Sequence, residues 1–325
     1  MTAEATDRSS ATFSDLFDAV ADNVARVIQG KRDVIELIVL CMVAQGHLLI
    51  EDAPGVGKTS LAKALSRSVD ASFGRIQFTP DLLPSDVIGV TVWNRHDSSF
   101  EFRPGPIFAN IVLADEINRA SPKTQAALLE SMAERQVTTD GQTTILPEPF
   151  MVIATQNPIE HEGTYPLPES QLDRFLMRIA VGYPSRTAEL DILRTHGGHS
   201  TLDDLAPVVD RSAVNALAEA ARHVHVSEPV QQYIVDLADA SRRHPQLALG
   251  ISPRASLNLQ RVGRARAARA GRDFVLPDDI KAIAGPVLSH RLLVRPEAQL
   301  SGVSAASVLE DILRQVPVPA GPSST

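Results

Sequence analysis

The sequence predicts an α/β fold, in which a parallel sheet lies between helices and a second, helical domain follows. Two observations support this prediction. Before about residue 186, short and almost continuously apolar segments alternate with helical patterns, which is typical of a parallel sheet covered on both faces. After that point the apolar segments stop and amphipathic helical segments follow one another.

The chain of 325 residues divides into four sections on this pattern. Both ends are rich in small and polar residues, so we expect residues 1–12 and 317–325 to be disordered. The α/β core is expected over residues 13–185 and the helical domain over residues 186–316.

The core is expected to begin with two helices and a strand. Apolar residues recur at helical spacing over residues 13–45, and an interruption at 28–33 predicts two helices joined at Gly30. The segment HLLIE (47–51) predicts the first strand. A loop with two glycines then leads into a helix over 58–69.

Two further strands are predicted over residues 110–116 and 150–157, where the sequence is again short and apolar. A helix over 122–134 lies between them, with Ser121 as its N-cap and Pro122 in its first turn. Ligands of such sheets bind at the carboxyl ends of the strands, so the residues that end these strands are candidates for a site.

Two insertions interrupt the alternation and predict β-ribbons that project from the sheet. Residues 86–105 contain two β-rich runs around a polar turn, and residues 136–145 place Asp140 and Gly141 between two Thr/Val/Ile-rich arms. The second domain is expected to contain helices over residues 187–195, 212–222, 228–241, 253–270 and 277–288.

The charge of the chain argues against two classes of partner. Lys and Arg number 31 against 39 Asp and Glu, and the formal net charge of −8 disfavours a general nucleic-acid coat and an acidic-membrane binder. A basic run does occur, but its arginines do not share one narrow helical face, so a solvated or inter-subunit face is preferred to nucleic-acid binding. These arginines are Arg261, Arg264, Arg266, Arg269 and Arg272.

The single cysteine, Cys41, lies in the longest apolar run and can form no internal disulfide, which favours a buried thiol and a reducing compartment, the cytoplasm. That run (34–44) has 11 residues and contains Glu36, so it is too short to cross a bilayer. Neither membrane insertion nor a signal sequence is expected.

The segment EDAPGVGKTS (51–60) predicts a phosphate-binding loop between a strand and a helix. Glycines allow the backbone to wrap around a β-phosphate, and the helix start adds partial positive charge. Lys58 is expected to contact the β- and γ-phosphates, and Thr59 to ligate Mg²⁺. The ATP contacts are expected at Ala53, Pro54, Gly55, Val56, Gly57, Lys58, Thr59 and Ser60. The alternative is a sharp glycine turn before an ordinary helix.

Asp52 stands where the usual G-x-x-x-x-G-K-[ST] pattern begins with glycine. The close approach to phosphate is made by Gly55, Gly57 and the helix start, so an aspartate at the strand exit can turn the chain and direct its carboxylate away from the anion. We expect this carboxylate to face a backbone N–H group or a cation outside the loop.

Three polar residues end the second and third predicted strands. Asp115 is expected to hold Mg²⁺, which needs few protein ligands, and Glu116 to polarise the attacking water. Asn157 is expected to orient that water, although an Asn-Pro pair also commonly begins a turn.

Four segments together resemble the MoxR family of AAA+ ATPases over about residues 13–315. They are GHLLIEDAPGVGKT, IVLADEINRASPKTQAALLESMAERQVT, ATQNPIEHEGTYPLPESQLDRF and SPRAS. The resemblance implies an AAA+ P-loop domain with a five-stranded parallel sheet, two β-hairpin inserts, a C-terminal helical lid and assembly into a homo-oligomeric ring, a hexamer.

The resemblance also implies roles for residues outside the loop. Arg174 in ESQLDRF matches the family's arginine finger, which reaches the γ-phosphate held by the neighbouring subunit. The alternatives are a salt bridge from Arg174 to Asp173 or Glu169, and a finger at Arg178 or Arg135.

Arg254 in ISPRAS matches the family's second sensor, by which the lid responds to the nucleotide, with Ser252 and Pro253 as the expected helix start. From there its guanidinium is expected to reach back over the bound phosphates, and a solvated surface arginine is the alternative. Residues matching the base-binding segment are Val27, Ile28 and Gly30.

The function implied by the resemblance is Mg-dependent ATP hydrolysis between ring subunits, coupled to remodelling, maturation or activation of a client protein. Clients of the family often contain a von Willebrand factor A domain, and the process includes insertion of metal or other cofactors. Two alternatives are a nucleotide-gated assembly scaffold with little turnover and a DNA-stimulated motor.

Overall fold

The computed structural model describes residues 11–158, 163–195 and 201–319. Most of the two ends expected to be disordered, residues 1–10 and 320–325, lie outside this range. Thr12 is described and caps the first helix, where its hydroxyl accepts a hydrogen bond from the backbone N–H of Asp15.

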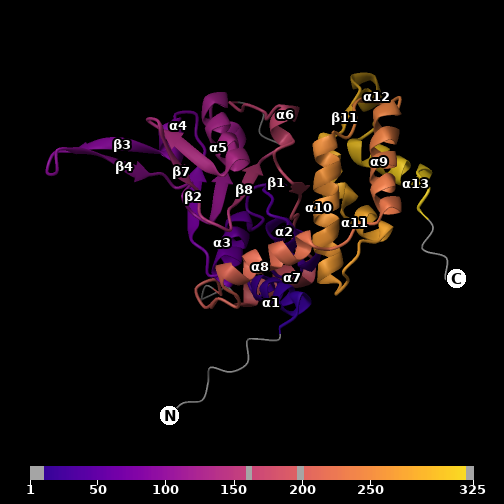
Figure 1. Ribbon diagram of the computed structural model, residues 1–325, viewed down its shortest axis with the longest axis horizontal. Coiled ribbons are helices and arrows are strands. Elements are labelled where there is room, and N and C mark those ends of the chain that lie inside the picture. Colours follow the sequence, from indigo (N-terminus) through magenta and orange to yellow (C-terminus); the bar gives the residue numbers. More distant parts are fainter. Residues whose placement is uncertain (1–10, 159–162, 196–200, 320–325) are drawn as a thin grey trace, which may run out of the picture.

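A five-stranded parallel sheet lies at the centre of the core (Figure 1), in the order β2-β5-β8-β1-β9. Its strands along the chain are β1 (Leu48–Glu51), β2 (Phe73–Gln77), β5 (Ile111–Asp115), β8 (Met151–Gln156) and β9 (Met177–Ile179). The ends of β1, β5 and β8 agree with the predicted strands to within one residue.

Side chains of these strands alternate between two apolar layers. Leu48 and Ile50 pack on the side of the first three helices, whereas Leu49 packs on the side of the two helices that follow β2 and β5. The helices of the first layer are α1 (Phe13–Ala25), α2 (Arg32–Val43) and α3 (Lys58–Ser68), and those of the second are α4 (Pro84–Ile88) and α5 (Pro122–Glu134).

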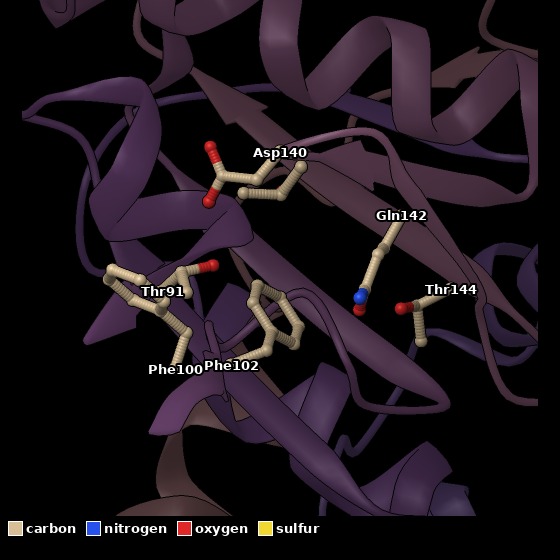
Figure 2. A pocket seen from close by; sticks show the side chains of 7 residues that line it. Thr91, Phe100, Phe102, Asp140, Gln142 and Thr144 are labelled. Atoms are coloured by element: carbon tan, nitrogen blue, oxygen red, sulfur yellow. The ribbon is translucent and has the colours of Figure 1, made fainter. Parts of the chain in front are cut away.

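Two antiparallel hairpins extend from the sheet layer, as predicted. They are formed by β3 (Gly89–Asn94) with β4 (Ser99–Pro104), and by β6 (Gln136–Thr139) with β7 (Gln142–Ile145). The first projects far from the rest of the molecule (Figure 1). The hairpins face each other across an open hollow of about 440 Å³, into which the rings of Phe100 and Phe102 point (Figure 2).

The C-terminal domain is helical and packs beside the core (Figure 1). Its five predicted helices are present, and two further helices of this domain, α12 and α13, were not predicted; nor was the short α6 at the end of the core. The helices after the hairpins are α6 (Glu169–Leu172), α7 (Arg186–Thr195), α8 (Arg211–Arg222), α9 (Glu228–Arg243), α10 (Pro253–Arg269), α11 (Pro277–Leu288), α12 (Pro296–Leu300) and α13 (Ala305–Gln315). The expectation that strands end at about residue 186 is wrong in one detail, because β10 (Leu247–Leu249) pairs with β11 (Leu293–Val294).

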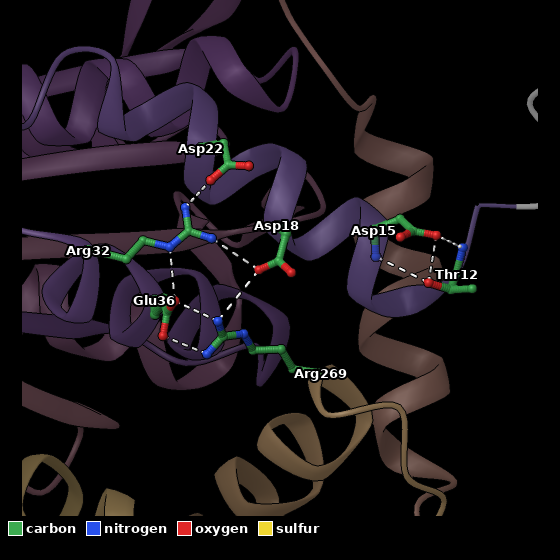
Figure 3. Close-up of polar contacts among 7 residues, drawn as sticks. All are labelled: Thr12, Asp15, Asp18, Asp22, Arg32, Glu36 and Arg269. Carbon is green, nitrogen blue, oxygen red and sulfur yellow. Dashed lines mark hydrogen bonds and ion pairs between the residues drawn. The ribbon is translucent and has the colours of Figure 1, made fainter.

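A charge network joins this domain to the core (Figure 3). The Arg269 guanidinium at the end of α10 donates two hydrogen bonds of 2.5 Å to the Glu36 carboxylate on α2. Arg32 donates to the same carboxylate at 2.9 Å and also pairs with Asp18 and Asp22 on α1. Burial raises the pKa of Glu36, but the hydrogen bonds from Arg269 and Arg32 outweigh it and the pKa is lowered.

Three arginines of the basic run, which covers α10 and the turn after it, pair with acidic residues of the same chain. Arg269 pairs with Glu36, and Arg266 and Arg272 both pair with Asp279. These partners lie in the same chain, but all three arginines keep part of their side chain exposed, so the solvated or inter-subunit face stays a prediction.

Two further predictions concern the cysteine and membrane spans. Cys41 is buried, and burial raises the pKa of its thiol to about 12. Within the described ranges, every helix is too short or too polar to span a bilayer.

Candidate active site

The predicted phosphate-binding loop joins β1 to α3. Gly55 has φ +84° and Gly57 has φ +90°, and glycine adopts these left-handed conformations without strain. The backbone N–H groups of Gly57, Lys58, Thr59 and Ser60 donate to no other described residue. The helix start therefore presents a row of unused donors together with the positive end of its dipole, which suits a phosphate group.

Lys58 folds back over this loop. Its Nζ donates to the carbonyl oxygen of Asp52 at 2.8 Å and to that of Ala53 at 3.2 Å. Both acceptors are neutral, so phosphate oxygens at the same loop offer the ammonium group stronger, charge-assisted hydrogen bonds.

Asp52 points away from the loop interior, as predicted. One carboxylate oxygen accepts a hydrogen bond from the backbone N–H of Gly182 at 2.5 Å, and the other accepts from the N–H of Ala53 at 2.8 Å. The carboxylate thus ties the loop to the segment after β9. It adds no negative charge directed at the phosphate position.

Asp115 ends β5, and two side chains hold its carboxylate. Thr155 on β8 donates to Oδ1 at 2.7 Å, and Arg75 on β2 pairs with Oδ2 at 2.7 Å. The hydroxyl oxygen of Thr155 also accepts the backbone N–H of Glu116 at 2.9 Å. One hydroxyl group therefore fixes both acidic positions.

Glu116 follows with φ +58°, a left-handed conformation that is uncommon for residues other than glycine and occurs frequently at functional sites. Its carboxylate accepts a hydrogen bond from Nε2 of Gln77 at 2.8 Å and pairs with Arg119 at 3.4 Å. The side chains of Gln77 and Arg119 therefore hold the Glu116 carboxylate at the carboxyl edge of the sheet.

Asn157 directly follows β8 and is 7 % exposed. Since β8 lies between β5 and β1, this position falls between the acidic pair and the phosphate-binding loop. The sheet thus brings the three predicted parts of the site to one edge.

The predicted base-binding segment also lies beside the loop. Cδ1 of Ile28 is 3.7 Å from the position that a Cβ on Gly57 would take. Gly30 has φ +71°, and the next residue, Lys31, donates from Nζ to the carbonyl oxygen of Tyr183 at 2.7 Å. An open hollow of about 500 Å³ borders Ile28 and Gly30. Val27 is buried.

These residues fit a nucleotide with a magnesium ion. The unused N–H donors and Lys58 provide for phosphates, and the Thr59 hydroxyl and the Asp115 carboxylate are the hard oxygen ligands that Mg²⁺ prefers. The described residues contain no cluster of three or more His, Cys, Asp or Glu side chains suited to a metal held by protein alone.

The two predicted arginines lie at the other edge of the sheet. The N–H of Leu176 donates to the carbonyl oxygen of His47 at 2.8 Å, so the segment after Arg174 runs past the start of β1, whereas the loop follows the end of β1. Arg174 donates from Nη1 to the carbonyl oxygen of Leu129 at 2.7 Å.

Arg254 is exposed in the first turn of α10. The residues that begin this helix, Ser252 and Pro253, line a hollow of about 660 Å³ together with Glu169 and Asp173. The expected reach of Arg254 back over the phosphates is therefore not made within one chain, since this helix start lies beside the Arg174 segment.

The alternatives for the finger have partners of their own. Arg178 pairs with Glu51 at 3.1 Å, and Arg135 donates to the carbonyl oxygen of Gln45 at 2.8 Å. Among the described residues, Arg174 forms no ion pair with Asp173 or Glu169, the two alternative partners. The Asp173 carboxylate pairs instead with Arg291 at 2.7 Å.

Comparison with known proteins agrees with this geometry. Residues 47–177 match the model of the ATPase family associated with various cellular activities (AAA), and residues 239–312 match the AAA lid domain.

The protein YeaC of Bacillus subtilis is 48% identical over 304 residues, which cover 94% of this chain and 95% of YeaC. Chaperone MoxR1 of Mycobacterium tuberculosis is 41% identical over 305 residues, which cover 91% of this chain and 80% of that protein. Protein MoxR of Methylorubrum extorquens is 32% identical over an alignment of 333 residues, which covers 94% of this chain and 96% of that protein.

The chain belongs to the MoxR family of AAA+ ATPases. A crystal structure of a putative ATPase from Cytophaga hutchinsonii has the same fold, with a TM-score of 0.89, 40% identity and coverage of 95% of this chain and 96% of that one. This MoxR-family protein is accordingly an ATP-hydrolysing P-loop NTPase with an AAA core and a helical lid.

Sequence reasoning missed four side chains that organise this MoxR-family site. Thr155, Arg75 and Gln77 hold the acidic pair, and Arg291 holds Asp173. The signal for Thr155 was a hydroxyl in an otherwise apolar strand, FMVIATQN. Arg75 and Gln77 belong to a strand that was not predicted, so no pattern directed attention to them.

Proposed function

We propose that this MoxR-family ATPase hydrolyses Mg·ATP between the subunits of a homo-oligomeric ring, a hexamer, and uses the cycle to remodel, mature or activate a client protein. The placement of its arginines carries the proposal. Arg174 and the helix start with Arg254 lie at the sheet edge away from the phosphate-binding loop of the same chain. Both guanidinium groups therefore need a second subunit, whose loop faces them in a head-to-tail ring.

Each residue has one role in this proposal. The loop N–H groups and Lys58 bind the phosphates, and Glu116 accepts a proton from the attacking water that Asn157 orients. Arg174 of the neighbouring subunit stabilises the charge that develops on the γ-phosphate. Arg254 contacts that phosphate, so the position of the lid depends on whether the phosphate is bound. Thr59 and Asp115 would hold Mg²⁺, which when bound neutralises phosphate charge.

The hairpins are the proposed contact with the client. Trp93 and Phe100 stack edge to face at 5.0 Å on the first hairpin, yet remain 51 % and 73 % exposed. Large exposed aromatic side chains on a projecting element are typical of binding surfaces.

The name of the relative chaperone MoxR1 agrees with a client protein. A von Willebrand factor A domain in the client, and metal or cofactor insertion, remain part of the proposal by resemblance. A cytoplasmic location suits the single buried thiol.

Steady-state ATP hydrolysis by two variants tests the proposal. Arg174→Ala and Glu116→Gln are expected to lower kcat by about 10³-fold or more while binding of a fluorescent ATP analogue is kept. Arg178→Ala and Arg135→Ala serve as matched arginine controls and are expected to retain turnover. Unchanged hydrolysis in both Arg174→Ala and Glu116→Gln would support the scaffold alternative instead.

The client is identified by capture. Glu116→Gln protein with ATP is expected to retain the client that wild-type protein releases during turnover, and Lys58→Ala protein provides the control that does not bind nucleotide. Recovery of the same proteins with both variants would contradict nucleotide-dependent remodelling. Stimulation of hydrolysis by DNA at low salt would favour the motor alternative.

A further inference from the structure

Arg291 is a buried arginine that the roles above do not use. It belongs to the short helix Ser289–Arg291 that follows α11, and its side chain is only 3 % exposed. A buried guanidinium needs a full set of hydrogen-bond acceptors, because its desolvation is otherwise very costly. Its acceptors show what this charge is used for.

Most of these acceptors belong to the segment that carries Arg174. Nε donates to Oδ1 of Asp173 at 2.7 Å, and Nη2 donates to the carbonyl oxygens of Asp173 at 3.3 Å and Phe175 at 2.5 Å. Nη1 reaches the carbonyl oxygen of Leu176 at 3.3 Å. One lid side chain therefore binds the residues on both sides of Arg174.

The remaining contacts fix Arg291 to the lid. Nη1 also donates to the carbonyl oxygen of Val287 in α11 and lies 2.7 Å from Nε2 of His290. The guanidinium is thus held by α11 on one side and by the backbone around Arg174 on the other. Movement of this part of the lid has to move that backbone or break several hydrogen bonds to a buried charge.

Arg291 is not an alternative finger. Its burial and its acceptors keep it inside the chain, whereas Arg174 is partly exposed and spends one hydrogen bond on the Leu129 carbonyl group. The Leu129 carbonyl oxygen is the only acceptor of Arg174 among the described residues, and it is neutral. A phosphate oxygen can replace it as the acceptor without disturbing the Arg291 contacts.

We propose that Arg291 is a positioning residue for Arg174, through which the lid of one subunit sets the place of the finger that this subunit offers to its neighbour. The inference rests on the proposed function, in which Arg174 acts between subunits. It predicts that loss of Arg291 damages the neighbour's site and leaves the subunit's own site intact.

Mixing of inactive variants distinguishes these two sites. Glu116→Gln subunits have an inactive site and an intact finger, and Arg174→Ala subunits have an intact site and no finger. An equimolar mixture of these two is expected to recover about one quarter of wild-type activity, because half the sites are intact and half of those receive a finger. This mixture is the control for the finger itself.

Arg291→Met is then mixed with each partner in turn. Alone it is expected to lose at least tenfold in kcat. With Glu116→Gln it is expected to recover activity as the control does, and with Arg174→Ala to recover none. Any of three results would overturn the positioning role. They are recovery of activity in the mixture with Arg174→Ala, no recovery in either mixture, and full activity of Arg291→Met alone.

Three checks complete the experiment. Arg272→Met removes a similar arginine whose partner, Asp279, lies within the lid, and it is expected to keep wild-type kcat. Should Arg291→Met not fold, Asp173→Asn weakens the same contact and is expected to follow the same pattern of rescue.

A control mixture that recovers no activity would overturn the finger between subunits, and this proposal with it. A control that recovers while the Arg291→Met mixtures do not would overturn the positioning role alone.

Discussion

Thr155 shows how much of the site depends on a residue without a catalytic motif. Its hydroxyl group donates to Asp115 and accepts from the N–H of Glu116, so it sets the distance between the two acidic positions. The threonine is 1 % exposed, so its hydroxyl group depends on these two protein partners for its hydrogen bonds.

Removal of this hydroxyl is expected to reduce activity without unfolding the protein. Thr155→Val keeps the shape of the side chain in β8 but loses both hydrogen bonds, and kcat is expected to fall about 10- to 100-fold. Thr155→Ser keeps the hydroxyl and serves as the control. Hydrolysis is measured against Mg²⁺ concentration, and equal activities of Thr155→Val and wild type would contradict this role.

His47 predicts a pH dependence of stability. It is buried before β1, where Nδ1 accepts the N–H of Val152 at 3.0 Å and Nε2 lies 3.0 Å from the carbonyl oxygen of Met132. Burial lowers its pKa to about 3, so the folded chain keeps it neutral at a pH where the unfolded chain protonates it. Stability is therefore lost as pH falls below the unfolded value of 6.5.

The free energy of unfolding is expected to fall by about 2 kcal/mol from pH 7 to pH 5 through this histidine alone. His47→Gln removes the titration, and urea unfolding of both proteins at the two pH values isolates the contribution. An equal loss in His47→Gln and wild type would show that other groups, such as His290, cause the dependence.

At the scale of elements, most helices and the central strands follow from apolar periodicity, and the rest do not. β2 was missed because FGRIQ places Arg75 and Gln77 in an edge strand with one buried residue. β9, β10 and β11 have three residues or fewer, which is too short for a pattern. The carboxyl-edge part of the site was predictable because the carboxyl ends of parallel strands lie at the same edge of a sheet. The location of Arg174 at the opposite edge follows from the pairing of β9 with β1, and that of Arg254 follows from lid packing; no local sequence pattern contains either.

The ion pair between α10 and α2 is expected to hold the lid on the core. Arg269→Met leaves the Glu36 carboxylate, which is 20 % exposed, with fewer partners, and is expected to lower the free energy of unfolding by about 1–3 kcal/mol. Arg314→Met removes an arginine that is 73 % exposed and is expected to change it by about 0–1 kcal/mol. Urea unfolding measures both, and equal effects would contradict a structural role for the pair.

At the scale of the whole molecule, the site and the hairpins lie on separate parts of the core. The hairpins contribute no residue to the phosphate-binding loop or the acidic pair, so client contact and hydrolysis are expected to be separable by mutation. The buried packing between the sheet and its helices provides the rigid connection through which nucleotide state is expected to reach the hairpins.

Substitution of the two exposed aromatic residues tests this separation. The double variant Trp93→Ala, Phe100→Ala is expected to keep wild-type hydrolysis without client and to lose capture of the client. Leu300→Ala, which removes a side chain on α12 that is 91 % exposed, is the control and is expected to keep both. Client capture by the double variant at wild-type yield would contradict a role for the first hairpin.

The central claim is that each site needs the finger of another subunit. Its most direct test is ATP hydrolysis by mixtures of Glu116→Gln and Arg174→Ala protein at a fixed total concentration and varied ratio. The expected curve rises from almost no activity in either pure variant to a maximum of about one quarter of wild type at equal amounts. Activity that stays at the level of the pure variants at every ratio would contradict hydrolysis between subunits.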